Sequence, residues 1–261
     1  MTGGLRWSVM KTDKGTSRLG HHFSIWWKRQ DGFFIGVNAL GGVLWEFAVG
    51  SLSERRKQRY GDAEYDWDFR VNTTSGSVQW RDRFLGLLHS PYMPTEPALF
   101  HEILGSLLQT IRVDLRSFVF IDLGSGKGRT LLMASDYPFK KIIGVELLPS
   151  LNEAAQANIA AYKSENQKCF ALESICGDAC EFTFPEEPLA LYLFNPLPED
   201  GLVRVLSNLQ VSLEKNPREC FVLYYNPLLE KHLSNESWLK KISGTPQFVI
   251  YASRQRHKTT E

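Results

Sequence analysis

The sequence has few of the residues from which metal sites and disulfide frameworks are built. Its 261 residues include four cysteines and six histidines, without a CxxC pair and without a cluster at metal-ligand spacing. Three of the cysteines, Cys169, Cys176 and Cys220, lie in or beside apolar runs that predict strands, which is typical of reduced, buried thiols in an intracellular protein. We therefore expect no bound metal.

A strong charge of either sign is also missing. The chain has 30 Lys and Arg residues against 29 Asp and Glu residues, so the net charge is +1 and no overall field would attract nucleic acid. The length suits one domain with an extension, and a hydrophobic content of 43% is sufficient for a full core. A protein or a small molecule is therefore a better expected partner than nucleic acid.

One apolar run raises the question of a membrane segment. Residues 32–52 carry a single charge, Glu46, and 21 residues would be enough for a span. Five glycines, Asn38 and the Glu46 carboxylate argue against a span, because polar groups are costly in the bilayer. We expect a helix docked on the core of a cytoplasmic protein, with a membrane-associated segment as the alternative.

Two common nucleotide-binding motifs are absent as well. A dinucleotide fold requires G-x-G-x-x-G, but Arg129 stands where the third glycine would fall, and the P-loop pattern G-x-x-x-x-G-K-[ST] does not occur at this turn. What is present is an apolar run over 117–123 that contains Asp122, followed by glycines at alternate positions and by an apolar helical stretch over 131–135. A strand, a glycine turn and a helix allow the backbone to approach a cofactor closely.

The residues from Asp122 to Gly128 match the pattern [DE]-x-G-x-G-x-G at every position, and this stretch resembles the first motif of class I S-adenosylmethionine (SAM) methyltransferases. The resemblance implies that SAM is the cofactor. It also implies that the following residues contact the cofactor: Asp122, Gly124, Ser125, Gly126 and Gly128.

Polar residues at the ends of later strands agree with this resemblance. Glu146 ends the next apolar run, 141–146, and a carboxylate can accept hydrogen bonds from both ribose hydroxyls. A third run, 169–176, leads to Asp178 and Ala179, where the resemblance places recognition of adenine. Taken alone, each of these residues could equally be a turn former or a solvated charge.

The alternation of helical and strand patterns defines the expected fold. Predicted strands are 117–123, 141–146, 169–176, 189–194, 219–225, 238–242 and 247–252, and predicted helices are 99–111, 131–135, 149–163 and 201–213. We expect an α/β fold with a doubly wound, mostly parallel seven-stranded sheet and an antiparallel C-terminal hairpin. The SAM-binding domain would span 61–261 with its core at 117–253, after a helical N-terminal extension over 1–60.

A proline-rich segment over 90–97 precedes the core. It resembles the Tyr-x-Pro-Thr/Ser segment of small bacterial methyltransferases and of seven-strand protein-lysine methyltransferases, which packs over the methionine end of the cofactor. The resemblance implies cofactor contacts for Tyr92, Thr95 and Glu96, since an aromatic face attracts a sulfonium and a carboxylate can meet an ammonium group. A simple proline-rich connector is the alternative.

The acceptor site is expected where the fourth and fifth strands end, at Asn195-Pro196 and at Tyr225-Asn226-Pro227. Asn195 and Pro196 resemble the start of the [DN]-P-P-[YF] motif of amino-methylating enzymes, which implies a catalytic role in steering an amine, with Asn195 also beside the cofactor. Tyr225 and Asn226 would contact the substrate. Termination of a strand by Asn-Pro is the alternative.

The predicted function is transfer of a methyl group from SAM to an amine nitrogen of a protein or small molecule. Leu197 and Pro198 depart from the motif of enzymes that methylate bases, which argues against a base as the acceptor. Base methylation, an inactive SAM-binding regulatory module and a nicotinamide oxidoreductase remain as alternatives.

Overall fold

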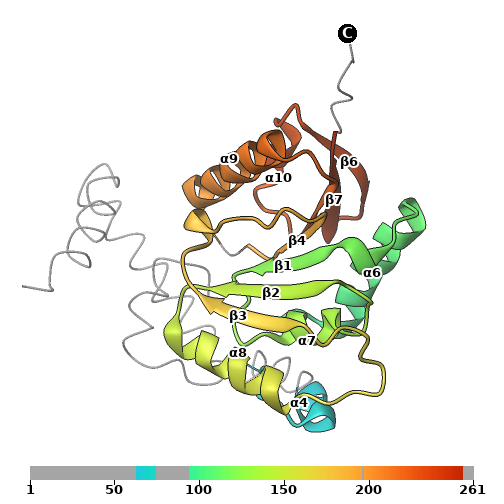
Figure 1. Cartoon of the computed structure of the whole chain (residues 1–261), viewed down its shortest axis with the longest axis vertical. Coiled ribbons are helices and arrows are strands. Elements are labelled where there is room, and N and C mark those ends of the chain that lie inside the picture. Colours follow the sequence, from blue (N-terminus) through green and yellow to red (C-terminus); the bar gives the residue numbers. More distant parts are fainter. Residues whose placement is uncertain (1–62, 75–93, 196, 255–261) are drawn as a thin grey trace, which may run out of the picture. The chain divides into compact units, whose positions relative to one another are not determined.

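The computed structural model describes residues 63–74, 94–195 and 197–254 of the chain (Figure 1). The predicted extension over 1–60 and the apolar run over 32–52 lie outside these residues, as do Tyr92 and Pro196. The boundary predicted between residues 60 and 61 and the expectations for these residues stay predictions.

The described part of the chain is built around a seven-stranded sheet with the order β3-β2-β1-β4-β5-β7-β6 (Figure 1). Its strands are β1 (Val119–Leu123), β2 (Lys141–Glu146), β3 (Leu172–Cys176), β4 (Leu189–Leu193), β5 (Cys220–Tyr225), β6 (Leu239–Gly244) and β7 (Phe248–Ser253). The five strands β1 to β5 pair in parallel, whereas β7 runs antiparallel to both of its neighbours, β5 and β6. The strand order reverses at β1 and β4, and ligands of open α/β sheets bind at the carboxyl ends of strands at such a point.

Helices cover both faces of this sheet. They are α4 (Ala63–Phe69), α6 (Pro97–Thr110), α7 (Arg129–Ala134), α8 (Pro149–Ala161), α9 (Glu199–Lys215) and α10 (Glu230–Ser234), with 3-10 turns η1 (Leu115–Ser117) and η2 (Ala179–Glu181). Helices α6 and α8 each begin at a proline, whose missing amide would have had no partner in the first turn.

The alternation of side chains along β1 separates two apolar clusters. Val119, Ile121 and Leu123 pack with apolar residues of α9 and α10, whereas Phe120 packs with α6 and α7 on the opposite face. All five residues of β1 are buried, as expected for a central parallel strand that helices cover on both sides. The polar groups that follow β1 are therefore held by a rigid core.

The topology confirms the predicted α/β fold, including the seven strands, the antiparallel hairpin at the C-terminal end and the adjacent fourth and fifth strands. The third strand begins three residues later than predicted, at Leu172 instead of Cys169. The reason is that the Cys169 amide donates to the carbonyl of Ser135, 2.9 Å away, and so takes no part in the sheet.

The prediction of three buried thiols is wrong for Cys176. Cys169 and Cys220 are buried, as is Cys180, but Cys176 is exposed because it ends β3, one of the two edge strands of the sheet. Within the described residues, no group of side chains is suited to hold a metal ion. None of the described helices combines the length and the apolar character needed to cross a membrane.

We predict that Gly144→Ala destabilises the protein, because β2 passes close to the turn that follows β1. A Cβ at Gly144 would lie 2.6 Å from Leu131 Cδ1 and 2.6 Å from Ser125 Oγ, so that one of these groups must move. Such overpacking costs about 1–3 kcal/mol of unfolding free energy, which urea denaturation would measure.

Gly105→Ala in α6 is the control, since no atom lies within 4 Å of its Cβ. It should stabilise by up to about 1 kcal/mol, and equal losses in both variants would contradict this account.

Candidate functional site

Three glycines in the left-handed backbone region form the turn between β1 and α7. Gly124, Gly126 and Gly128 have φ angles of 81°, 55° and 82°, which L side chains rarely adopt. The amides of Gly124 and Ser125 both donate to the carbonyl of Val145, over 2.8 and 3.1 Å. This turn, called the glycine loop below (residues 124–128), is therefore fixed against the carboxyl end of β2.

Gly128 serves a second purpose at the start of α7. A Cβ at this position would lie 3.1 Å from the Cβ of Ala155 in α8. The missing side chain thus lets α7 begin close to α8, which is the packing role of the third glycine in dinucleotide folds. The chain meets this need one residue earlier, so Arg129 can occupy the next position.

Glu146, the last residue of β2, directs its carboxylate at the glycine loop. It is 6% exposed, and its Oε2 accepts a hydrogen bond from the Gly126 amide over 2.8 Å. Its Oε1 accepts one from the Leu148 amide over 2.9 Å. Each oxygen of a carboxylate offers about two acceptor positions, so this group can combine a structural role with recognition of ligand hydroxyls.

Asp122 is the last residue but one of β1, two positions before the glycine loop, and is 3% exposed. Burial raises the pKa of its carboxyl to about 8; a hydrogen bond with Thr130 acts to lower it, and the nearby Glu146 carboxylate raises it. Asp122 therefore holds its proton at neutral pH in this structure. Among the contacts described, Glu146 accepts from two backbone amides, whereas no backbone amide donates to the Asp122 carboxyl.

Asp178 and Ala179 lie directly after β3, beside the Glu146 end of β2. Asp178 Oδ1 accepts from the Cys180 amide over 2.8 Å and caps η2, with its side chain exposed, whereas Ala179 is buried. The Gly177 amide donates to the Glu146 carbonyl over 2.9 Å. The structure thus brings these residues next to Glu146, and their contact with adenine stays a prediction.

Asn195 and Asn226 lie together at the ends of β4 and β5, as predicted from the order of the strands. Both adopt left-handed backbone conformations, with φ angles of 43° and 47°. The Asn195 side chain donates from Nδ2 to the Asn226 carbonyl over 2.6 Å, and its Oδ1 accepts from the Tyr224 hydroxyl over 2.7 Å. The amide therefore ties two loops together, and its role toward a methyl acceptor stays a prediction.

The segment before α6 reaches the same edge of the sheet. Thr95 Oγ1 lies 3.0 Å from the hydroxyl of Tyr192 in β4, and both residues are buried. Burial raises the pKa of Tyr225, and the nearby carboxylate of Glu96 raises it further. The ring centroids of Tyr225 and Phe194 are 4.2 Å apart. A carboxylate and two aromatic rings are thus gathered where β4 and β5 end.

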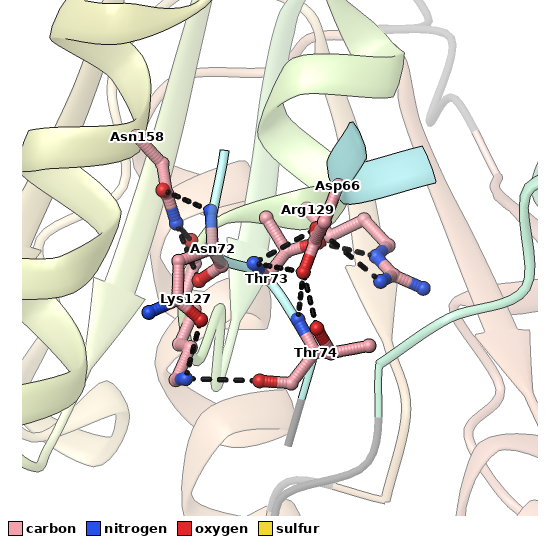
Figure 2. Close-up of polar contacts among 7 residues, drawn as sticks. All are labelled: Asp66, Asn72, Thr73, Thr74, Lys127, Arg129 and Asn158. Carbon is pink, nitrogen blue, oxygen red and sulfur yellow. Dashed lines mark hydrogen bonds and ion pairs between the residues drawn. The ribbon is translucent and has the colours of Figure 1, made fainter. Parts of the chain in front are cut away.

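A polar cluster behind the glycine loop has no counterpart in the sequence predictions. Lys127 and Arg129 are buried, and both donate hydrogen bonds to residues of the segment 66–74 (Figure 2). The sequence did contain one indication of such a cluster, because two cations stand inside an apolar motif and buried cations need acceptors. The acceptors themselves could not be located, because nothing in the sequence of 66–74 marks them as neighbours of the loop.

Comparison with known proteins adds structural likenesses only. No protein-family model and no curated protein sequence matches the chain. Similar solved structures include a protein from Pyrococcus horikoshii OT3 (14% identity, 69% of this chain and 100% of that chain, TM-score 0.46) and an RNA methyltransferase from Salinibacter ruber in complex with S-adenosyl-L-homocysteine (20%, 65% and 97%, 0.38). A third is a dimethyladenosine transferase from Plasmodium falciparum (12%, 63% and 64%, 0.43), so the match spans about two thirds of that protein. These values do not assign an activity to this chain.

We predict that Asp122→Asn changes how stability depends on pH. The pKa of Asp122 is raised to about 8 in the folded protein, against about 3.9 in an unfolded chain, so the folded state binds the proton more tightly. The contribution of this carboxyl to the free energy of unfolding is fully present below pH 4. It is lost as the pH rises toward 8, at about 1.4 kcal/mol per pH unit. Asn cannot ionise, so the variant should lack this loss between pH 5 and pH 9.

Urea denaturation across this pH range would measure the effect, with Asp68→Asn, a change at an exposed aspartate, as the matched control. The control should keep the wild-type profile. A profile of Asp122→Asn that runs parallel to the wild type would show that Asp122 is already ionised in the folded protein.

Proposed function

We propose that this chain is a SAM-dependent methyltransferase. The observation that carries the proposal is the buried Glu146 carboxylate bonded to the Gly126 amide, beside a loop of three left-handed glycines. A buried acid at the end of one strand and a glycine turn at the end of its neighbour suit a ligand with vicinal hydroxyls and a charged amino-acid portion. The glycine turn follows β1, one of the two strands at the switch point of the sheet, and Glu146 ends β2, the neighbour of β1.

The residues of this edge fit the parts of SAM in chain order. In the proposal, the glycine loop and Asp122 hold the amino-acid portion, Glu146 holds the ribose hydroxyls, and Asp178 with Ala179 contacts adenine. Thr95 and Glu96 would close over the methionine end, since Thr95 is anchored to β4 through Tyr192.

When bound, SAM supplies a methyl group on a sulfonium, which is already activated for transfer. The protein then has to align the acceptor and exclude water. Asn195 is suited to alignment because the Tyr224 hydroxyl and the Asn226 carbonyl fix its amide in one orientation. An amide oxygen has two lone pairs, so Oδ1 can accept from Tyr224 and from a target amine.

An amine is the acceptor class that the described residues favour. Glu96 lies close enough to Tyr225 to raise the pKa of its phenol, and Tyr225 packs beside Phe194. A carboxylate with two aromatic rings attracts a cation such as an alkylammonium group. The ammonium group would release a proton to water before its nitrogen accepts the methyl group. The proposal is therefore N-methylation of a protein or small-molecule amine.

The cofactor assignment is tested by ribose recognition. We expect wild-type protein to bind S-adenosylhomocysteine at least roughly tenfold more tightly than its 2′-deoxy analogue, since a hydrogen bond to a charged group is worth about 1.5–3 kcal/mol. Glu146→Ala should weaken binding and remove this discrimination. Titration calorimetry would measure both affinities, with Glu165→Ala, at an exposed acid, as the control. Discrimination that persists in Glu146→Ala would assign Glu146 a structural role only.

The acceptor assignment is tested at Asn195. Asn195→Ala should lower transfer of labelled methyl groups by about 10²-fold and change SAM affinity less than about twofold, because alignment acts on the transition state. Asn216→Ala is the matched control, since it removes a similar bond, from Nδ2 to the Glu186 carbonyl over 3.0 Å, and Asn216 precedes β5 whereas the acceptor site follows it. If Asn195→Ala loses melting temperature but keeps its activity per folded molecule, the steering role is wrong.

A further inference from the structure

The segment from Asp66 to Thr74 is bound to the glycine loop and its flanking helices by side-chain hydrogen bonds (Figure 2). These residues precede the core by more than forty positions and carry no motif of their own. Three observations show how closely the segment and the loop are joined.

Asn158 of α8 connects the two pieces directly. Its Oδ1 accepts from the Asn72 amide over 2.8 Å, and its Nδ2 donates to the Asn72 carbonyl over 3.0 Å. The same Nδ2 donates to the carbonyl of Lys127 over 2.9 Å. Asn158 is 5% exposed, so one buried amide fixes the backbone of the segment and the backbone of the loop together.

Arg129 reaches the segment through a hydroxyl. Its Nε donates to Thr73 Oγ1 over 2.6 Å, and that hydroxyl donates to Asp66 Oδ1 over 2.5 Å, so the Nε proton and the hydroxyl proton each have a defined acceptor. Arg129 Nη2 lies 3.6 Å from the same carboxylate oxygen, and the guanidinium carbon lies 5.1 Å from the ring centroid of Tyr65. The side chain of Arg129 is 1% exposed.

Asp66 is held as the charged partner in this arrangement. Burial acts to raise its pKa, but hydrogen bonds from the hydroxyls and amides of Thr73 and Thr74 outweigh burial and bring the pKa below its usual value. An ionised carboxylate thus faces the buried guanidinium.

Lys127 makes the third connection, from within the loop itself. Its Nζ donates to the Thr74 carbonyl over 2.9 Å and to Asn72 Oδ1 over 3.2 Å. Lys127 stands between Gly126 and Gly128, which both have left-handed φ angles. Its side chain and its carbonyl therefore anchor the most constrained part of the loop to the segment.

Undocking of the segment would leave two cations and several polar groups of the loop without these partners. Buried charges that lose a partner are strongly destabilised, so the loop would have to rearrange or open to water. Gly126, whose amide meets Glu146, is the residue next to Lys127 and would move with it. The shape of the cofactor site is thus linked to a segment that lies outside it.

We infer that Asp66, Thr73 and Arg129 are positioning residues, which set the conformation of the glycine loop without touching the ligand. Docking of the segment 66–74 and binding of the cofactor are then coupled, so each stabilises the other. The inference rests on the proposed function for the identity of the ligand, but the link between segment and loop exists in the free protein.

Amide hydrogen exchange reports this link residue by residue. The amides of Asn72, Thr73 and Thr74 donate to the side chains of Asn158 and Asp66, so their protection measures docking. The Gly126 amide donates to Glu146, so its protection measures the shape of the loop. In the wild type, added S-adenosylhomocysteine should increase protection at all four amides.

Thr73→Val removes the bridging hydroxyl at nearly constant volume. We expect faster exchange at Asn72 and Thr74, and also at Gly126, together with an affinity for S-adenosylhomocysteine that is lower by about fivefold or more. Thr73→Ser keeps the hydroxyl, so its exchange rates and its affinity should be close to those of the wild type. Thr110→Val is the control, because its hydroxyl bonds only within α6 among the contacts described, to the Ser106 carbonyl.

A second variant tests the link from the loop side, since Thr73 is fully buried and its replacement could unfold the protein. Lys127→Met should speed exchange at Thr73 and Thr74 although the segment itself is unchanged. The inference would be overturned if Thr73→Val speeds exchange in the segment alone and leaves Gly126 protection and affinity as in the wild type. It would also be overturned if Lys127→Met leaves exchange at Thr73 and Thr74 unchanged. If the wild type binds no S-adenosylhomocysteine, the proposed function fails, and the ligand-free exchange still decides whether segment and loop are linked.

Discussion

The hydrogen bond from the Gly126 amide to the Glu146 carboxylate is the contact on which the carboxyl edge of the sheet depends. It requires a buried acid at the end of β2, a left-handed turn after β1 and close contact between these neighbouring strands. Glycine is needed because only glycine adopts this turn easily. The two strand ends are fixed because helices cover the core of the sheet on both faces. In the proposed function, the same contact places the carboxylate that would bind the ribose.

The acids on the two sides of the glycine loop differ in protonation. Asp122 is kept neutral at pH 7 by burial, whereas Asp66, behind the loop, stays ionised because Thr73 and Thr74 donate to it. Lys127 and Arg129 are held on the side of the loop that faces the segment 66–74, as Figure 2 shows. In the proposed function, the cofactor would then meet mainly backbone groups of the loop and the Glu146 carboxylate.

The sequence was sufficient to predict the sheet and the polar residues at the strand ends, because apolar runs and glycine spacing are local signals. It was insufficient for the cluster behind the loop, whose partners lie 53 to 86 residues apart and meet only in the folded chain. It also could not predict that the Asn195 amide is fixed by Tyr224 and Asn226, since this depends on two left-handed residues at neighbouring strand ends. Cys176 was misjudged because the pattern does not reveal which strand forms the edge.

The most direct test of the account is a calorimetric titration of the purified chain with SAM and, separately, with NADH. The account predicts saturable binding of one SAM per chain, because Glu146 and the glycine loop form a single site, and no binding of NADH, because Arg129 replaces the third glycine of the dinucleotide motif. Binding of NADH, or absence of SAM binding by a folded protein, would contradict it.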